Sequence, residues 1–290
     1  MRPRDVVAAL LAVLLCTGAA GAHQPVMDMA PRWEGGFGVQ VRHEYRFSKD
    51  LLEEDDRVSN GLGREKRVHT TWLEGIYTFK REIRATLKIP FVVQERVAGV
   101  QGSARRHRGV GLGDVIVGVP LRKYWNLSGW TANVGLTPSL RVPTGSVSAD
   151  YPVGDGSWDV GLSTSLSAES VFWYSLIDLF WWTNTPGRKG IDPGDEYGMD
   201  LNLGIHPFHD NAHNLGAFVM LDVRARHQER GQDDLGDPTG GSRLSLGPVL
   251  VGYWRNLMLR GEVAFPVYER VFGTQVARGT EFNLGLGVAF

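Results

Sequence analysis

Cysteine, long apolar runs and excess charge of one sign are all scarce in this sequence, and each absence excludes a class of protein. Cys16 is the only cysteine, so the chain forms no internal disulfide. Beyond residue 22 no run of 18 apolar residues occurs, which excludes a transmembrane helix. The formal net charge is −1 over 290 residues, so no basic excess points to nucleic acid as a partner.

Enzyme signatures are also missing. The sequence contains no G-x-G-x-x-G, G-x-x-x-x-G-K-[ST], H-E-x-x-H or G-x-S-x-G motif. His43, His69, His107 and His227 are scattered, without the Ser or Asp partner that nucleophilic or acid–base catalysis requires. We therefore expect a protein that is not an enzyme and that carries no cofactor.

Residues 1–22 are predicted to be a signal peptide. Two arginines precede an apolar run of 11 residues at 6–16, and residues 20–22 have the small-x-small form of a cleavage site. The run is too short for a membrane-spanning helix, which needs about 20 residues. A lipoprotein site at Cys16 is disfavoured, because Leu15 before it is large. We expect an exported chain that begins near His23.

The mature chain alternates apolar and polar residues with period two. At its end, apolar side chains from Phe282 to Phe290 alternate with polar or small ones. Such alternation over about 10 to 14 residues indicates long β-strands with one apolar face. Twelve segments show it, near 33–47, 68–79, 82–96, 112–124, 130–143, 157–166, 171–182, 197–206, 214–227, 242–253, 257–268 and 278–290.

The expected connections alternate in length. Six are long, at 48–67, 97–111, 144–156, 183–196, 228–241 and 269–277. Five are short, at 80–81, 125–129, 167–170, 207–213 and 254–256. Short periplasmic turns and long outer loops are typical of outer-membrane barrels, whereas strands of soluble β-sandwiches usually have about 5–6 residues.

The predicted fold is all-β: a transmembrane, antiparallel, up-and-down β-barrel of about twelve strands over residues 33–290. Residues 23–32 are expected to form a periplasmic segment before it. With an even strand number, both termini lie on the periplasmic side. The expected location is the outer membrane of a Gram-negative bacterium, with the lipid bilayer as partner.

Charged residues fall on the faces that would line the lumen, because a charge facing lipid is costly. The set holds eight basic and nine acidic residues: Arg42, Glu44, Arg46, Glu74, Arg84, Lys88, Asp114, Arg122, Arg141, Asp159, Asp178, Asp200, Asp222, Arg224, Arg260, Glu262 and Glu281. This balance favours ion pairs that brace the barrel over a selectivity filter of one sign. The candidates for solute contact are Arg84, Lys88, Asp114, Arg141, Asp178, Asp222, Arg260 and Glu262.

Segment 171–182 is apolar on both faces apart from Ser175 and Asp178. Depending on its register, Phe172, Tyr174, Leu176 and Phe180 face either an aromatic solute in the lumen or the lipid. The pattern leaves both alternatives open.

Two groups of residues suit a metal ion. His206, His209 and His213 surround a short periplasmic turn, and imidazoles at such spacing bind Zn or Cu. Near the mature N-terminus, His23 precedes Met27 and Met29, which are soft ligands suited to Cu(I). The alternative is a solvated turn and a tail that contains methionine.

Two motifs resemble a known family. Gly111-Leu112-Gly113-Asp114-Val115 opens a strand, and Leu140-Arg141-Val142-Pro143-Thr144-Gly145-Ser146 closes another. The pair, with residues 105–290, resembles the outer-membrane family named for the meta-pathway of phenol degradation. Phe290 similarly resembles the C-terminal signal of proteins inserted by the outer-membrane barrel assembly machinery.

The resemblance implies a channel that admits small aromatic or apolar solutes. Passive diffusion through a charge-lined lumen is therefore the function that we expect. A copper-handling barrel and a structural barrel with a closed lumen are the alternatives.

Overall fold

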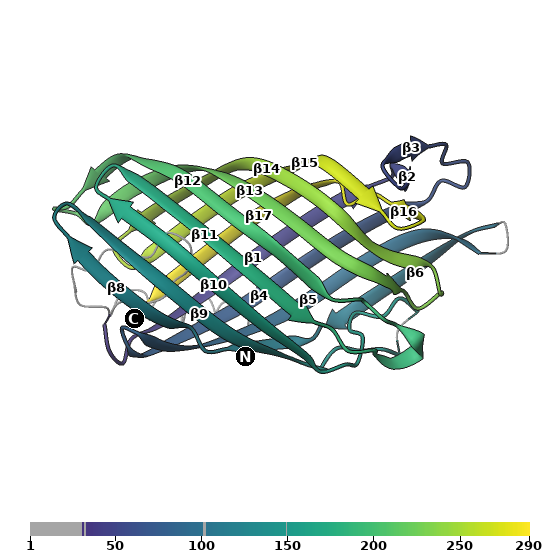
Figure 1. Cartoon of the computed structure of the whole chain (residues 1–290), viewed down its shortest axis with the longest axis horizontal. Helices are drawn as coiled ribbons and strands as arrows, with labels where there is room; N and C mark the ends of the chain where they lie inside the picture. The colour runs from purple at the N-terminus through teal and green to yellow at the C-terminus, as the bar shows by residue number, and fades with distance from the viewer. Residues whose placement is uncertain (1–30, 32, 101–102, 149) are drawn as a thin grey trace, which may run out of the picture.

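The structure, a computed structural model, describes residues 31, 33–100, 103–148 and 150–290 (Figure 1). Its wall has twelve strand positions, one of them shared by three short strands. They are β1 (Phe37–Ser48), β4 (Glu65–Lys80), β5 (Ile83–Val100), β6 (Ser103–Leu112) with β7 (Val115–Gly118) and β8 (Leu121–Leu127), β9 (Trp130–Val142), β10 (Asp159–Ser170), β11 (Trp173–Thr183), β12 (Glu196–Asp210), β13 (Leu215–Gln232), β14 (Pro238–Trp254), β15 (Leu257–Val271) and β17 (Thr280–Ala289).

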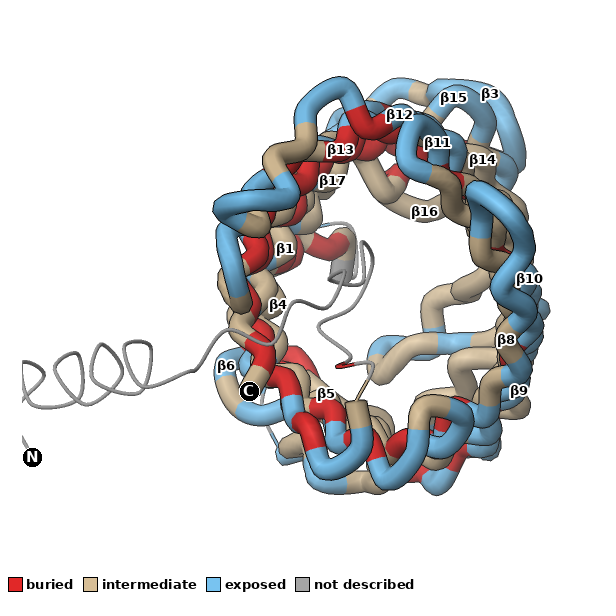
Figure 2. Tube along the Cα trace, turned by 90° about the vertical axis from the view of Figure 1, so that its left-hand side faces the viewer, coloured by how far each residue is buried: buried red, intermediate tan, exposed pale blue. Residues whose placement is uncertain are grey.

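The strands close into one antiparallel barrel, as Figure 2 shows in a view along its axis. Each strand pairs with its neighbours in sequence, and β1 closes the ring by pairing with β17, Gly38 opposite Ala289. The predicted twelve-strand up-and-down barrel is thus confirmed. No helix among the described residues is long and apolar enough to cross a membrane.

The β6–β8 position is interrupted twice, and local chemistry explains both breaks. Gly113 lies so close to Pro90 that an added Cβ would be 3.1 Å from the proline ring. Pro120 has no N–H to donate to a neighbouring strand. Its carbonyl oxygen nevertheless accepts from the amide of Arg84 at 3.0 Å, so the wall stays closed.

The two ends of the barrel differ in their connections. Short turns such as 81–82 and 255–256 lie at one end, and the longer connections lie at the other. That second end carries β2 (Leu51–Glu53), β3 (Asp56–Val58), β16 (Thr274–Val276) and the 3-10 turn η1 (Arg188–Gly190). We call it the outer mouth.

Two predicted loops are wrong. Most of 97–111 belongs to the ends of β5 and β6, and much of 228–241 belongs to β13 and β14. These strand ends are rich in charge, and the apolar alternation that marks a lipid-facing strand stops before the hydrogen-bonded ladder does. The sequence pattern therefore follows the apolar band and underestimates strand length.

The outer surface of the wall is apolar. Along β17, Phe282, Leu284 and Leu286 point outward and are 48–59% exposed. Their neighbours Asn283, Gly285 and Gly287 face the lumen side. A continuous belt of exposed Leu, Val and aromatic side chains with a polar interior is the surface expected of a barrel that lies in lipid.

Candidate functional site

Among the described residues, one large cavity of about 590 Å³ lies in the lumen. Its lining comes from β1, β4, β5 and β7 to β13. Strands β14, β15 and β17 contribute nothing to it. We call β4 to β11 the cavity wall and β13 to β17 the packed wall.

Three aromatic rings line the cavity, and an arginine lies over each. The guanidinium carbon is 4.5–5.6 Å from the ring centroid in the pairs Arg42–Trp72, Arg226–Phe180 and Arg141–Trp182. Such stacking holds a long, flexible arginine side chain against the wall. The lining therefore offers flat apolar surface and charge side by side.

Most charges of the cavity are paired. Arg42 bonds Glu74 at 2.9 Å, Arg226 bonds Asp200 at 2.5 Å, and Arg141 bonds the buried Asp159 at 3.1 Å. Lys88 and Asp178 both line the cavity as well. Within the described part of the chain neither has an ion-pair partner within 4.0 Å. These two charges are the ones that the cavity presents to a solute.

The packed wall uses its charges differently. Arg224 bonds three carboxylates, those of Asp222 at 2.6 Å, Glu281 at 3.2 Å and Glu262. Glu262 also accepts from Arg260 at 2.8 Å. Asp222 and Glu262 are almost fully buried, so their negative charge is compensated within the wall and is not offered to a solute.

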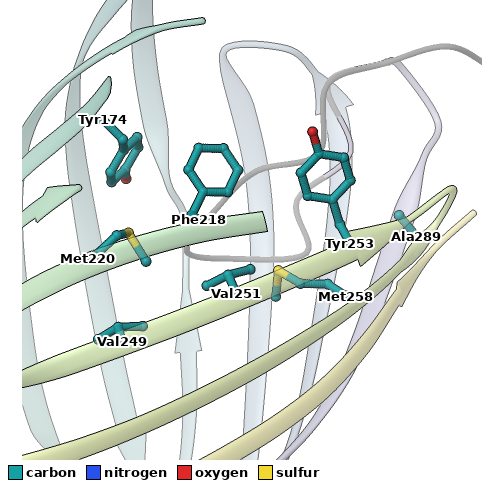
Figure 3. Packing of buried hydrophobic residues seen from close by; sticks show 8 residues of the cluster. All are labelled: Tyr174, Phe218, Met220, Val249, Val251, Tyr253, Met258 and Ala289. Atoms are coloured by element: carbon teal, nitrogen blue, oxygen red, sulfur yellow. The ribbon is translucent and has the colours of Figure 1, made fainter. Parts of the chain in front are cut away.

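Toward the end with the short turns, the packed wall carries an apolar cluster (Figure 3). Its buried members are Tyr174, Phe218, Met220, Val249, Val251, Tyr253, Met258 and Ala289. Trp33, which precedes β1, packs against it together with Leu176. In Figure 2, buried stretches lie at β1, β4, β5, β13 and β17, whereas β8 to β10 are mostly intermediate or exposed. The apolar cluster therefore fills the part of the lumen beside β13 to β17.

At the outer mouth, Arg96 joins the wall to two loops. Its guanidinium group bonds Asp233 at 2.5 Å and Asp234 at 2.6 Å, both more than 130 residues away in sequence. It also lies over the ring of Tyr151, at 4.3 Å from the centroid. Tyr151, on the β9–β10 loop, is 7% exposed. We call this arrangement the mouth clasp.

The two family-like motifs contact one another. Asp114 accepts from the backbone amides of Gly145 at 2.8 Å and Asp155 at 3.2 Å, and so holds both ends of the β9–β10 loop. Thr144 donates to the carbonyl of Gly113 at 3.0 Å. A Cβ on Gly145 would lie 2.7 Å from the Cα of Gly154. Asp114, predicted to contact solute, instead holds a loop.

The same loop is attached to β6 by Asp150. His107 donates from Nδ1 to a carboxylate oxygen of Asp150 at 3.2 Å. This hydrogen bond, supported by the amide of Arg108, lowers the pKa of Asp150 from its ordinary value. Asp150 therefore keeps its charge into more acidic solution than an isolated aspartate does.

The eight predicted solute-contact residues fall into three groups. Lys88, Arg141 and Asp178 line the main cavity. Asp222, Arg260 and Glu262 lie in the ion-pair network of the packed wall. Arg84 is 3% exposed and donates to the hydroxyl of Tyr124 at 3.1 Å, and Asp114 holds the loop. Contact between solute and the first group stays a prediction.

The predicted imidazole site does not form. His206 is 5% exposed, stacks on Phe218 with ring centroids 4.0 Å apart, and lies 3.1 Å from the hydroxyl oxygen of Tyr253. His213 bonds Asp210 at 2.7 Å instead, and this bond lowers the pKa of Asp210. Across the described residues no group of three His, Cys, Asp or Glu side chains is arranged for a metal ion.

His209 approaches His206 only by a ring contact, with centroids 5.2 Å apart. The three imidazoles therefore do not converge, because the apolar cluster engages one and solvent surrounds another. The other predicted ligands, His23, Met27 and Met29, lie outside the described residues.

The register of β11 resolves the open question on its apolar residues. Tyr174, Leu176 and Phe180 face the lumen, the first two in the apolar cluster and the third in the cavity. Phe172 lies in the β10–β11 turn and is 73% exposed, so its placement in the lumen is wrong. The alternation pattern did not identify Trp182 and Arg226 as residues of the cavity lining. It placed Trp72 on the polar face of its segment, where an aromatic ring is irregular, without indicating a role for it.

These features define a transmembrane β-barrel of the outer-membrane class. A model of the family described as "putative MetA-pathway of phenol degradation" matches residues 54–277. The chain belongs to this family, and the predicted resemblance is confirmed.

A solved outer-membrane structure shows the same fold. An outer membrane channel from Pseudomonas putida F1 superposes with a TM-score of 0.68 and 14% identity, covering 94% of this chain and 100% of that one. The β domain of the Bordetella autotransporter BrkA gives a TM-score of 0.46 and 12% identity, covering 89% and 100%. No curated protein sequence matches the chain.

Proposed function

We propose that the protein is an outer-membrane channel through which small aromatic or other apolar solutes diffuse passively. The observation that carries this proposal is the cavity of about 590 Å³ inside the barrel. Sites for small molecules commonly have about 300–1,000 Å³, so this cavity has room for a single-ring compound. The family description and the fold of the Pseudomonas channel support the same conclusion.

The lining suits a solute that is apolar over most of its surface and polar at one edge. Trp72, Phe180 and Trp182 supply flat apolar contact, while Lys88 and Asp178 supply charges that have no ion pair within 4.0 Å among the described residues. A solute gains from leaving water only where its polar atoms find such partners. Entry would follow the concentration gradient, because passive diffusion needs no energy-coupling domain.

Solute entry into liposomes that carry the folded protein tests the proposal. Phenol-sized polar and aromatic probes are compared with entry into empty liposomes. Polar probes are essential, because apolar probes cross lipid unaided. Protein-dependent entry of the polar probes is expected; its absence from a folded barrel would reject the channel.

A structural barrel with a closed lumen is the second candidate, and the mouth clasp favours it. Arg96, Asp233 and Asp234 join the wall to a loop across the outer mouth, leaving beside them a cavity of only about 140 Å³. This alternative predicts no conductance from the wild-type protein and conductance only after Arg96→Ala releases the clasp. A channel predicts conductance in both.

For the route to the membrane, we infer export by the signal peptide predicted at residues 1–22. We also infer insertion by the barrel assembly machinery, because Phe290 ends an alternating strand. A fusion lacking residues 1–22 is expected to stay out of the envelope, which cell fractionation would detect.

A further inference from the structure

A second, much smaller cavity lies between the packed wall and the outer mouth. It measures about 60 Å³, and four arginines reach its surface: Arg224, Arg226, Arg243 and Arg278. Glu281 is the one acidic residue in its lining. The four guanidinium groups come from β13, from β14 and from the connection before β17.

The four arginines differ in the number of carboxylates that they bond. Arg224 bonds three of them, and Arg226 bonds Asp200 at 2.5 Å. Arg243 reaches only Glu196, and at 3.9 Å. Arg278 bonds Glu281 at 3.2 Å, but that carboxylate also serves Arg224. Among the described residues, Arg243 therefore has no carboxylate closer than 3.9 Å and Arg278 shares its one ion-pair partner. The carboxylate of Glu269, which stands opposite Arg243, accepts from the backbone amide of Arg278 rather than from its guanidinium group.

Arg46 adds a fifth positive charge to this corner of the lumen. It stands opposite Glu281 in the β1–β17 pairing, yet no carboxylate among the described residues lies within 4.0 Å of it. Arg243, Arg278 and Arg46 are close enough to act on one another electrostatically. Like charges held together away from bulk water are unfavourable unless an anion compensates them.

The geometry points to an oxyanion site: we propose that Arg243 and Arg278, which line the small cavity, bind one small oxyanion group there, and that the positive charge of Arg46 adds to its attraction. Planar guanidinium groups match the oxygen pairs of carboxylate, phosphate and sulfate. The volume holds one such group and excludes a ring. The group is either a free anion or the acidic head of a solute.

The two cavities are joined in a way that favours the acidic head of a solute. Arg226 lines both of them, and its guanidinium group lies over the ring of Phe180. A carboxylate in the small cavity would leave an attached ring in the main cavity. This part of the inference rests on the proposed channel function and names aromatic carboxylates as its solute class.

Calorimetric titration of the refolded full chain in detergent tests the site, with sodium benzoate, inorganic phosphate and phenol as probes. Arg243→Gln and Arg46→Gln each remove one charge and keep most of the side-chain volume. Arg106→Gln is the matched control, because Arg106 is 68% exposed and pairs with Glu65 at 3.5 Å. Heat-modifiable gel migration shows whether each variant is folded, and either glutamine variant alone is sufficient for the test.

We expect an oxyanion probe to bind the wild type and the control equally. Losing one charge-assisted hydrogen-bonding group in Arg243→Gln should weaken binding about tenfold or more, and losing the charge of Arg46 in Arg46→Gln should weaken it in the same direction. Phosphate binding that benzoate does not displace supports the free anion, whereas benzoate binding without phosphate binding supports the head of a solute.

Two results would overturn the site: no binding of either anion to the folded wild type, or affinities that both glutamine variants leave unchanged. An uncharged polar probe of phenol size separates this outcome from a failure of the channel. Because such a probe carries no oxyanion and crosses lipid slowly, its protein-dependent entry into liposomes depends on the pore and not on the arginines. An inactive pore with an intact anion site, or the reverse, is therefore recognisable.

Discussion

The packed wall and the cavity wall carry similar inward charges but give them different numbers of partners. On the packed wall, Arg224 meets three carboxylates. On the cavity wall, Lys88 and Asp178 have none within 4.0 Å among the described residues. Composition alone does not distinguish a bracing charge from one available to solute. The number of close partners does.

The largest effect on the free energy of unfolding is expected from removing the guanidinium group of Arg224 from the packed wall. Arg224→Ala leaves the buried Asp222 without its ion-pair partner among the described residues and leaves Glu262 with Arg260 alone. Removing one partner of a buried ionic network costs about 3–5 kcal/mol. Urea unfolding in detergent micelles would measure the loss. The control is Arg108→Ala, whose exposed pair with Glu95 at 3.4 Å should contribute at most about 1 kcal/mol.

The apolar cluster gives the next largest effect. Phe218 is 2% exposed, and Phe→Ala in a packed site costs about 3 kcal/mol or more. The matched change is Phe180→Ala on the edge of the cavity, where the ring is only half-buried. We expect Phe218→Ala to lower the unfolding midpoint clearly more than Phe180→Ala. Equal losses would contradict the division into two walls.

Opening the mouth clasp should change permeation. Arg96→Ala releases Asp233, Asp234 and the ring of Tyr151 together. We expect a severalfold rise in the entry rate of polar probes into liposomes, with little change in the main cavity. An unchanged rate would show that the clasp does not limit passage.

Lys88, which has no ion pair within 4.0 Å among the described residues, should affect selectivity with little effect on folding. Lys88→Gln removes a cation from the lining of the main cavity, so the preference for anions should fall. The reversal potential in a salt gradient across a planar bilayer measures it. Lys123→Gln on the outer face of β8 is the control, and the same shift in both variants would exclude a specific effect of Lys88.

The smallest effect concerns acid pH. His107 lowers the pKa of Asp150, so this contact stabilises the β9–β10 loop above the ordinary aspartate pKa. The contribution is lost as the pH falls through the lowered pKa of the folded state. His107→Ala should return the Asp150 pKa toward its ordinary value, which carboxyl NMR titration detects. No upward shift would contradict the assigned cause.

The barrel itself was predictable, because lipid imposes a strict rule on every strand. Alternation such as that from Phe282 to Phe290 follows directly from one face in lipid and one in the lumen. Beyond the lipid-facing band this rule no longer applies, and the ends of the strands were not predicted there. The charged extensions 103–111 and 228–232 were expected to be loops because nothing outside the apolar band enforces alternation.

The interior was much less predictable. Period two places Lys88 and Arg224 on the same side of the wall but does not say how many carboxylates each will meet. The mouth clasp joins Arg96 to Asp233, which lies 137 residues away in the sequence. Arg243 and Arg46, on the distant strands β14 and β1, act on one another electrostatically. Such contacts depend on barrel closure and loop path. The imidazole site failed for the same reason, because Phe218 and Tyr253 come from other strands to engage His206.

Thiol modification of single-cysteine variants tests most directly whether solute passes along the cavity wall. Cys16 is the only cysteine and lies in the predicted signal peptide, so the wild type serves as an unreactive control. Ser163→Cys places a thiol in the main cavity, and Val251→Cys places one in the apolar cluster. A bulky charged methanethiosulfonate is applied while conductance is recorded. We predict that conductance falls for Ser163→Cys and not for Val251→Cys; block only at Val251→Cys, or none at a labelled Ser163→Cys, would contradict the account.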